Sequence, residues 1–142
     1  MLLGHVALTT AAIFTGAAFY VNFAEQPARL KLEDRALLQE WKPSYERGFM
    51  MQAPLAVLGF VLGVAAWWAT SDWRWIAGGL VMLANWPYTL MVIMPTNTQL
   101  NDTPLDAAGP GSRVLIEKWG GLHAVRTVLG ALATLIFLWA LN

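Results

Sequence analysis

Long apolar runs alternate with shorter polar stretches along the chain. Four of the runs are each close to the ~20 residues that cross a ~30 Å hydrocarbon core as a helix. They cover about Leu2 to Ala24 (2–24), Met50 to Thr70 (50–70), Trp75 to Met94 (75–94) and Val114 to Leu141 (114–141). Backbone polar groups in lipid must be satisfied within the span, so each run is predicted to be helical. The pattern predicts an all-α integral membrane protein, a four-helix antiparallel bundle in which residues 1–142 form a single transmembrane domain.

The longest polar stretch is the first loop, Glu25 to Phe49. Its apolar residues are interleaved with balanced charges; they are Leu30, Leu32, Leu37, Leu38 and Trp41. The spacing favours a short amphipathic helix on the membrane surface, or else a solvated connector whose apolar side chains cap the bundle. The third loop, residues 101–111, is rich in turn formers and is predicted to be irregular until the last helix begins near Ser112.

Composition agrees with a membrane location, since 57% of the residues are hydrophobic and 13% are charged. The first run lacks a basic start and precedes three more spans, so we interpret it as a retained helix and not as a signal peptide. The absence of cysteine excludes disulfides, thiolate metal sites and thiol catalysis. His5 and His123 are predicted to lie on opposite membrane sides, so we expect no metal site and no cofactor. No nucleic-acid partner is expected either, because the formal net charge is zero.

The distribution of basic residues predicts the orientation. The first loop carries Arg29, Lys31, Arg35, Lys42 and Arg47, and the third carries Arg113 and Lys118, whereas the second has only Arg74. We therefore expect loops one and three to be cytoplasmic and both termini to be periplasmic, in a bacterial inner membrane.

Polar residues interrupt the last apolar run at Trp119, His123, Arg126 and Thr127. Their i, i+4, i+7, i+8 spacing places them on one helical face, which is predicted to point into the bundle. Charge within a membrane span is costly and tends to mark a functional site. The other spans are polar at the same level, through Tyr20, Asn22, Glu25, Tyr45, Arg47, Gln52, Tyr88, Thr89 and Asn97.

This convergence predicts a cytoplasm-facing polar pocket. In it, Glu25 or Glu46 would neutralise Arg126, and His123 would serve as a proton carrier or ligand. The alternative is that Arg126 and Glu25 merely fasten helices together while His123 bonds a backbone carbonyl.

Other features have structural interpretations. Pro87 frees a carbonyl near Leu83, beside Asn85, and this predicts a kink with room for a cavity. The tryptophans Trp67, Trp68, Trp73 and Trp75 are expected to form an outer aromatic belt. The glycines Gly16, Gly59, Gly63, Gly78 and Gly79 are expected to allow close helix approach.

Several pieces, in this order, give the chain a family resemblance. They are Gly16-Ala-Ala-Phe-Tyr20, Glu25-Gln-Pro-Ala-Arg29, Trp41 with Tyr45 and Arg47, Gln52-Ala-Pro54, Pro87-Tyr-Thr89, Pro95-Thr-Asn97 with Leu100, and Trp119 with Leu122-His-Ala-Val-Arg-Thr127. Through these the chain resembles the small four-helix membrane proteins grouped with the fungal and bacterial anthrone oxygenases. The resemblance implies oxidation of an anthrone by dioxygen to the anthraquinone, without an evident metal or organic cofactor.

Such chemistry needs a base, a cation beside the developing enolate and an apolar slot. His123 is the candidate base and Arg126 the candidate electrostatic partner. The candidate substrate-binding residues are Glu25, Trp41, Tyr45, Arg47, Gln52, Tyr88, Thr89, Asn97, Trp119 and Thr127, of which Tyr45, Tyr88 and Asn97 would orient the substrate.

Two other classes of function fit the sequence. One is a lipid- or quinone-binding carrier, which needs Arg126 and the pocket but tolerates loss of His123. The other is a structural, oligomerising membrane protein whose polar stripe is fully paired and encloses no cavity. The expected partners are membrane lipid, a lipophilic small molecule and, for the oligomeric alternative, further copies of the chain.

Overall fold

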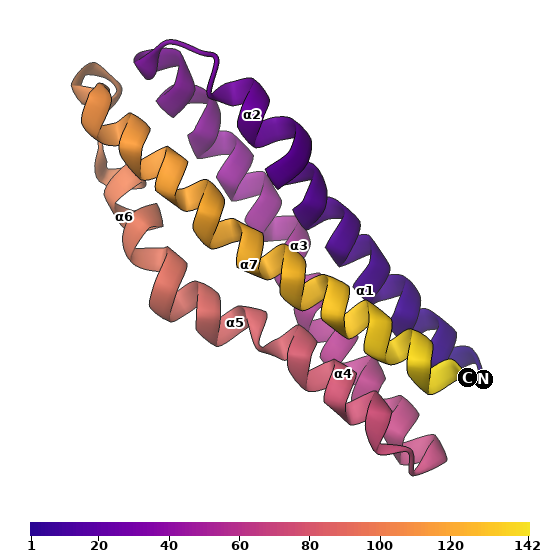
Figure 1. The fold of residues 1–142 in the computed structure, drawn as a ribbon. Helices are drawn as coiled ribbons and strands as arrows, with labels where there is room; N and C mark the ends of the chain where they lie inside the picture. The colour runs from indigo at the N-terminus through magenta and orange to yellow at the C-terminus, as the bar shows by residue number, and fades with distance from the viewer.

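In the computed structural model, which describes residues 1–142, four long helical segments run antiparallel (Figure 1). The first comprises α1 (Leu2–Tyr20), the π-helical η1 (Val21–Glu25) and α2 (Gln26–Arg29), and the second is α3 (Asp34–Thr70). The third comprises α4 (Trp73–Leu83), α5 (Asn85–Tyr88), the π-helical η2 (Thr89–Ile93) and α6 (Met94–Asp102). After the short 3-10 turn η3 (Leu105–Ala107), the fourth is α7 (Pro110–Leu141). The predicted all-α four-helix fold is confirmed.

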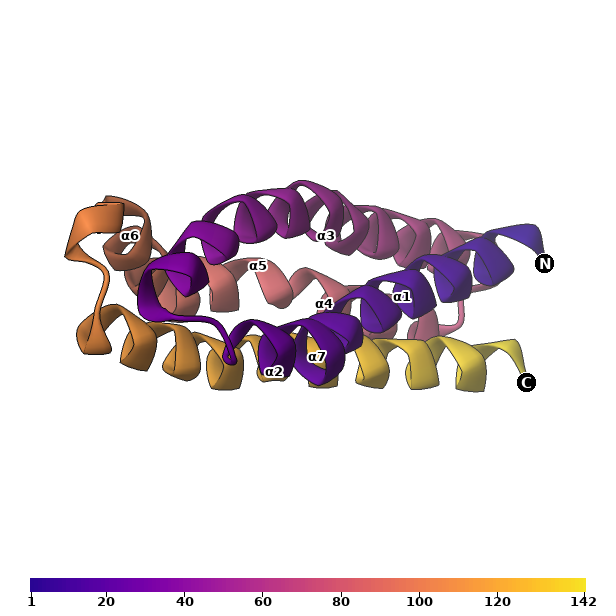
Figure 2. The same cartoon turned by 90° about the horizontal axis from the view of Figure 1, so that it is seen from above.

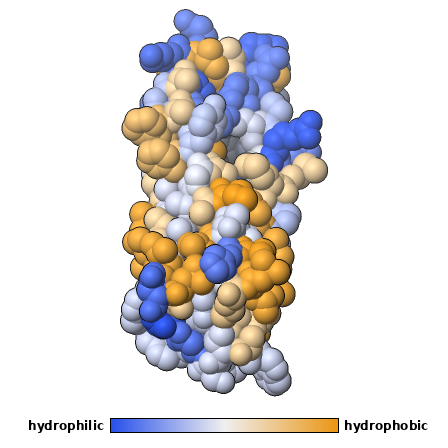
Figure 3. Space-filling view, turned by 90° about the vertical axis from the view of Figure 1, so that its right-hand side faces the viewer, coloured by the Kyte–Doolittle hydropathy of each residue, from blue (hydrophilic) through white to orange (hydrophobic).

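Each of the four segments is long and apolar enough to cross a membrane, as an integral membrane protein requires. The helices nevertheless extend beyond the apolar runs: α3 has 37 residues, or roughly 55 Å at 1.5 Å per residue. On the face shown in Figure 3, apolar side chains form a band below the middle of the bundle, and hydrophilic side chains gather at the top, the end that carries the first and third loops. The termini lie together at the opposite end (Figures 1 and 2).

The first loop is much shorter than expected, and the expected amphipathic helix on the membrane surface is wrong. Most of that stretch forms α2 and the first turns of α3, so the chain reverses only between Leu30 and Glu33. Leu37, Leu38 and Trp41 are fully buried and pack with residues of α6 and α7. Their apolar surface is covered by the bundle and not by lipid. This agrees with the other expectation for this stretch, in which its apolar side chains cap the bundle.

A second core fills the half of the bundle near the termini, and it corrects the expected aromatic belt. Trp75 is 1% exposed and packs against Phe137 at 5.6 Å between ring centroids, whereas Trp68 and Trp73 are exposed. Close helix contact here depends on glycine: a Cβ on Gly63 would lie 2.8 Å from the carbonyl oxygen of Trp75.

Two π-helical segments occur at corresponding places in the first and third spans. Both η1 and η2 follow a tyrosine, close with an i→i+5 hydrogen bond, and are followed by one residue and then a proline, Pro27 or Pro95. The missing proline N–H and the ring bulk disrupt the regular helical pattern at these points. Such π-bulges are frequent at functional sites.

The third span is also broken where Pro87 predicts it. Helix α4 ends at Leu83, and the ribbon is interrupted before α5 (Figure 1). The side chain of Asn85, the first residue of α5, donates from Nδ2 to the carbonyl oxygen of Met82 at 3.0 Å. The predicted kink is present, and its amide is buried inside the bundle.

Candidate functional site

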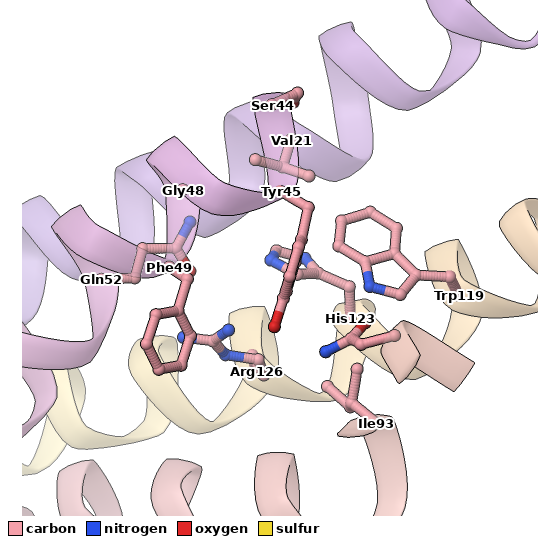
Figure 4. A pocket seen from close by; sticks show the side chains of 11 residues that line it. Val21, Ser44, Tyr45, Gly48, Phe49, Gln52, Ile93, Trp119, His123 and Arg126 are labelled. Atoms are coloured by element: carbon pink, nitrogen blue, oxygen red, sulfur yellow. The ribbon is translucent and has the colours of Figure 1, made fainter. Parts of the chain in front are cut away.

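A small cavity of about 20 Å³ lies among all four spans, where the charged end of the bundle meets the apolar half. Helix α3 contributes Tyr45, Phe49 and Gln52, α7 contributes Trp119, His123 and Arg126, the third span contributes Ile93, and the first span contributes Val21 (Figure 4). Asn97 of the third span also lines the cavity. The polar stripe predicted on the last helix therefore points inward.

The π-segment η1 places Asn22 where it fixes the orientation of His123. Asn22 Nδ2 donates to the carbonyl oxygen of Gly120 at 2.7 Å, so its Oδ1 faces the other side. That oxygen accepts from His123 Nδ1 at 2.8 Å and from Thr127 Oγ1 at 3.2 Å. Because an amide oxygen can only accept, Nδ1 carries the imidazole proton. In the neutral ring, Nε2 is then left with a lone pair that can take up a proton.

Arg126 is buried without a carboxylate. Arg126 is 8% exposed, and its Nε has no hydrogen-bond partner. The four ion pairs of the chain involve other arginines, Arg29, Arg74 and Arg113. The guanidinium lies 5.6 Å from the centroid of the Phe14 ring. A desolvated cation–π contact contributes about 2 kcal/mol or somewhat more, which offsets only part of the several kcal/mol that burying an unpaired ion costs.

The predicted partners of Arg126 lie elsewhere, which corrects that expectation. Glu25 pairs with Arg29 at 2.7 Å and also accepts a short hydrogen bond from Ser44. Glu46 is exposed, on an outer recess of the bundle. Arg29 and Arg126 are alternative partners for the Glu25 carboxylate. Arg29 lies one helical turn from Glu25 and is closer to it than Arg126 is, so Arg29 forms the pair.

Several buried polar atoms around the cavity have no partner. They are Oε1 of Gln52, both side-chain polar atoms of Asn97 and Nε1 of Trp119. A second cavity of about 10 Å³, which shares Phe49 and Arg126 with the first, contains the unpartnered Oδ1 of Asn85 and Oγ1 of Thr89. Buried polar groups are almost always hydrogen-bonded, so this concentration marks a place where water or a ligand binds.

A separate ionic cluster lies beside the cavity. Arg29 bonds Glu25, Glu40 at 3.1 Å and Ser44 at 2.8 Å, and its guanidinium lies 5.6 Å from the Trp119 ring centroid. Trp119 is in turn 4.9 Å from the His123 ring. In this cluster the cation has carboxylate partners, unlike Arg126.

Seven of the sequence-predicted residues line one of the two cavities: Tyr45, Gln52, Thr89, Asn97, Trp119, His123 and Arg126. Five do not. Trp41 stacks behind Tyr45 at 4.9 Å, the Tyr88 hydroxyl donates to the Leu122 carbonyl at 2.8 Å, and Thr127 bonds Asn22. Glu25 and Arg47 line a groove on the outside of the bundle.

Sequence reasoning gave no role to Asn22, Asn85 and Phe49. The two amides carried a signal, since uncharged polar residues inside apolar runs need partners. Phe49 carried none, because a phenylalanine in an apolar run looks like ordinary core. No three His, Asp or Glu side chains gather where they could hold a metal ion.

Fold and site together define a class: a small integral membrane helix bundle with an inward-facing histidine and a buried arginine that has no carboxylate partner. Residues 41–136 match the sequence model of the anthrone oxygenase family, and the chain belongs to this family. A curated anthrone oxygenase of Claviceps purpurea (strain 20.1) is 29% identical over 140 residues, which cover 87% of this chain and 79% of the relative. No solved structure matches the chain.

Proposed function

We propose that this protein is an oxygenase that oxidises a lipophilic, anthrone-like aromatic without a bound cofactor. The observation that carries the proposal is the charge of the cavity. It holds a guanidinium with no carboxylate and an imidazole whose partner is a neutral amide, so its formal charge is about +1 and favours an anion.

The reaction uses these two groups. Nε2 of His123 removes a proton from the methylene carbon of the anthrone, and Arg126 stabilises the negative charge that moves onto the ring oxygen. The resulting enolate gives its electrons to dioxygen, and a hydroperoxide forms at that carbon. Loss of water then leaves the second carbonyl, so that anthrone and dioxygen yield anthraquinone and one water.

The remaining polar atoms fit a substrate with oxygen atoms on its edge. Asn97 Nδ2 and the Trp119 indole N–H can donate to phenolic or carbonyl oxygens, and Gln52 Oε1 and Asn97 Oδ1 can accept from phenolic hydroxyls. Tyr45 and Phe49 supply aromatic surface next to them. These groups support a flat, partly polar ligand more than an aliphatic lipid tail.

The alternative is a carrier that binds a quinone or lipid without chemistry, and the same unpaired Arg126 supports it. A purely structural role has less support, because it requires a fully paired stripe and no cavity. We also propose that the site faces the cytoplasm, with loops one and three on that side, and that membrane lipid surrounds the bundle and delivers the ligand. Self-association of the chain is expected only under the structural alternative.

Oxygen uptake by the purified protein in lipid nanodiscs, with a dihydroxyanthrone as substrate, tests the proposal. We expect His123→Ala to lower kcat by about 100-fold or more, as for loss of a general base, with unchanged substrate binding. His5→Ala, which removes the other histidine from an exposed position, is the matched control and should leave the rate unchanged. If the protein binds the aromatic but takes up no oxygen, the carrier is favoured. If it neither binds the aromatic nor takes up oxygen, the structural alternative is favoured.

A further inference from the structure

The buried cavity is too small for the ligand that its chemistry suits. A volume of about 20 Å³ accommodates little more than a single water molecule. Sites for drug-sized aromatic molecules are roughly 300 Å³ or larger. The bundle must therefore open at one of its walls when a tricyclic molecule binds.

At the wall between the first span and α3, the cavity and the outer surface share lining residues. A groove of about 480 Å³ runs along the outer face of these helices, and it shares Val21, Ser44 and Gly48 with the buried cavity. A Cβ built on Gly48 would find no atom within 4 Å. The groove and the cavity therefore meet at these three residues, of which Val21 begins the π-segment η1.

The wall between α3 and α6 brings the cavity and the surface less close together. An outer recess of about 320 Å³ shares only Tyr45 with the cavity. Lys42 crosses this wall, with Nζ donating to the carbonyl oxygens of Asn101 at 3.0 Å and Thr103 at 2.6 Å. The Tyr45 ring is itself stacked on Trp41. Opening here would break the two Lys42 bonds. At the groove, the bonds of Ser44 to Arg29 and Glu25 lie one helical turn from Gly48.

The groove also lies at the right depth for an amphiphilic aromatic. Arg47, on its rim, is the last charged residue of α3 before the uncharged stretch 48–71, so the groove sits where the apolar band begins. Flat molecules with a polar edge concentrate at this level of a bilayer, as tryptophan and tyrosine side chains do.

We propose that the aromatic substrate reaches the cavity sideways from the membrane, through the groove between α1 and α3 and past Gly48. This passage rests on the proposed function for the identity of its ligand. Val21 and Ser44 form its two sides, and Gly48 leaves the opening between them.

The absence of native cysteine allows a direct test with Gly48→Cys. A bulky lipophilic maleimide on this cysteine should lower kcat/KM for a dihydroxyanthrone at least about tenfold relative to the same variant before labelling. The association rate of a dihydroxyanthraquinone, followed by tryptophan quenching, should fall to the same extent. Gly16→Cys is the matched control: it is an exposed glycine of α1 with open space at its Cβ, outside the groove, and its label should change neither quantity.

The two readouts separate this inference from the proposed oxygenase. If the label at position 48 slows anthraquinone binding and the protein takes up no oxygen, the passage is supported and the oxygenase is refuted. If the protein takes up oxygen and the label changes neither the uptake nor the association rate, only the passage is refuted. It would equally be refuted if a label on Asn101→Cys, at the other recess, slowed binding instead, or if the unlabelled protein bound no aromatic at all.

Discussion

Two buried arginines in this bundle have opposite surroundings. Arg29 has Glu25 and Glu40 as partners, whereas Arg126 has only the face of an aromatic ring and cavity walls. A buried ion pair often contributes little net stability, but an unpaired buried ion is a clear loss. A protein that keeps such an ion sacrifices stability for function, and the ion is therefore the best residue-scale indicator of the site.

Replacement of Arg126 by methionine should separate stability from function. Because the change removes an uncompensated buried charge and keeps an unbranched apolar stem, we expect the free energy of unfolding to rise by about 1–4 kcal/mol. Binding and turnover of the aromatic should be lost. Thermal unfolding in detergent, followed by near-UV circular dichroism, measures the first effect.

Arg29→Met is the control at matched burial, and it should lower stability because it leaves Glu25 and Glu40 without their cation. A destabilised Arg126→Met protein would mean that this guanidinium has partners that hold the helices together, and it would favour the fastening role.

At the scale of single elements, the irregular geometry of two helices determines which side chains face the site. The π-segment η1 turns Asn22 toward α7, and η2 connects Thr89, at the second cavity, with Ile93 and Asn97, at the first. A π-bulge amounts to one extra residue in a helix, so it changes which residues downstream face inward. Neither segment was recognised from the sequence, although Pro27 and Pro95 mark where each one ends.

Deletion of Met91, an exposed residue within η2, should remove this register change. Each residue turns a helix by about 100°, so the residues after the deletion, Asn97 included, should rotate away from the cavity. We expect helical content by far-UV circular dichroism to be retained and oxygen uptake to fall at least about tenfold.

Insertion of one alanine after Ala108, in the third loop, changes chain length without changing a helix register and should preserve activity. Full activity after the Met91 deletion would show that the register set by η2 does not position the site.

On the scale of the whole molecule, the bundle has a charged end and an apolar half. The four spans place both termini at one end and the first and third loops at the other (Figure 2). The basic residues of those loops lie at the loop end, and this asymmetry predicts that the end is cytoplasmic.

Single-cysteine labelling with a membrane-impermeant maleimide measures this orientation in the otherwise cysteine-free chain. We expect Glu33→Cys and Asp106→Cys, both exposed in the loops, to react only from the cytoplasmic side. Asn142→Cys, at the opposite end, should react only from the other side. Labelling with the sides reversed would contradict the orientation and place the site on the non-cytoplasmic half.

The sequence by itself determined the four spans, the kink at Pro87 and the inward face of His123 and Arg126. These features follow from short-range rules: the thickness of a bilayer, the helical period and the missing N–H of proline. Tertiary structure decided that Glu25 pairs with Arg29, that Asn22 orients His123, that Trp75 is core and that Phe49 lies between two cavities. Each of these outcomes depends on which of several competing partners, distant in the chain, comes closest in space, and a one-dimensional pattern does not contain those distances.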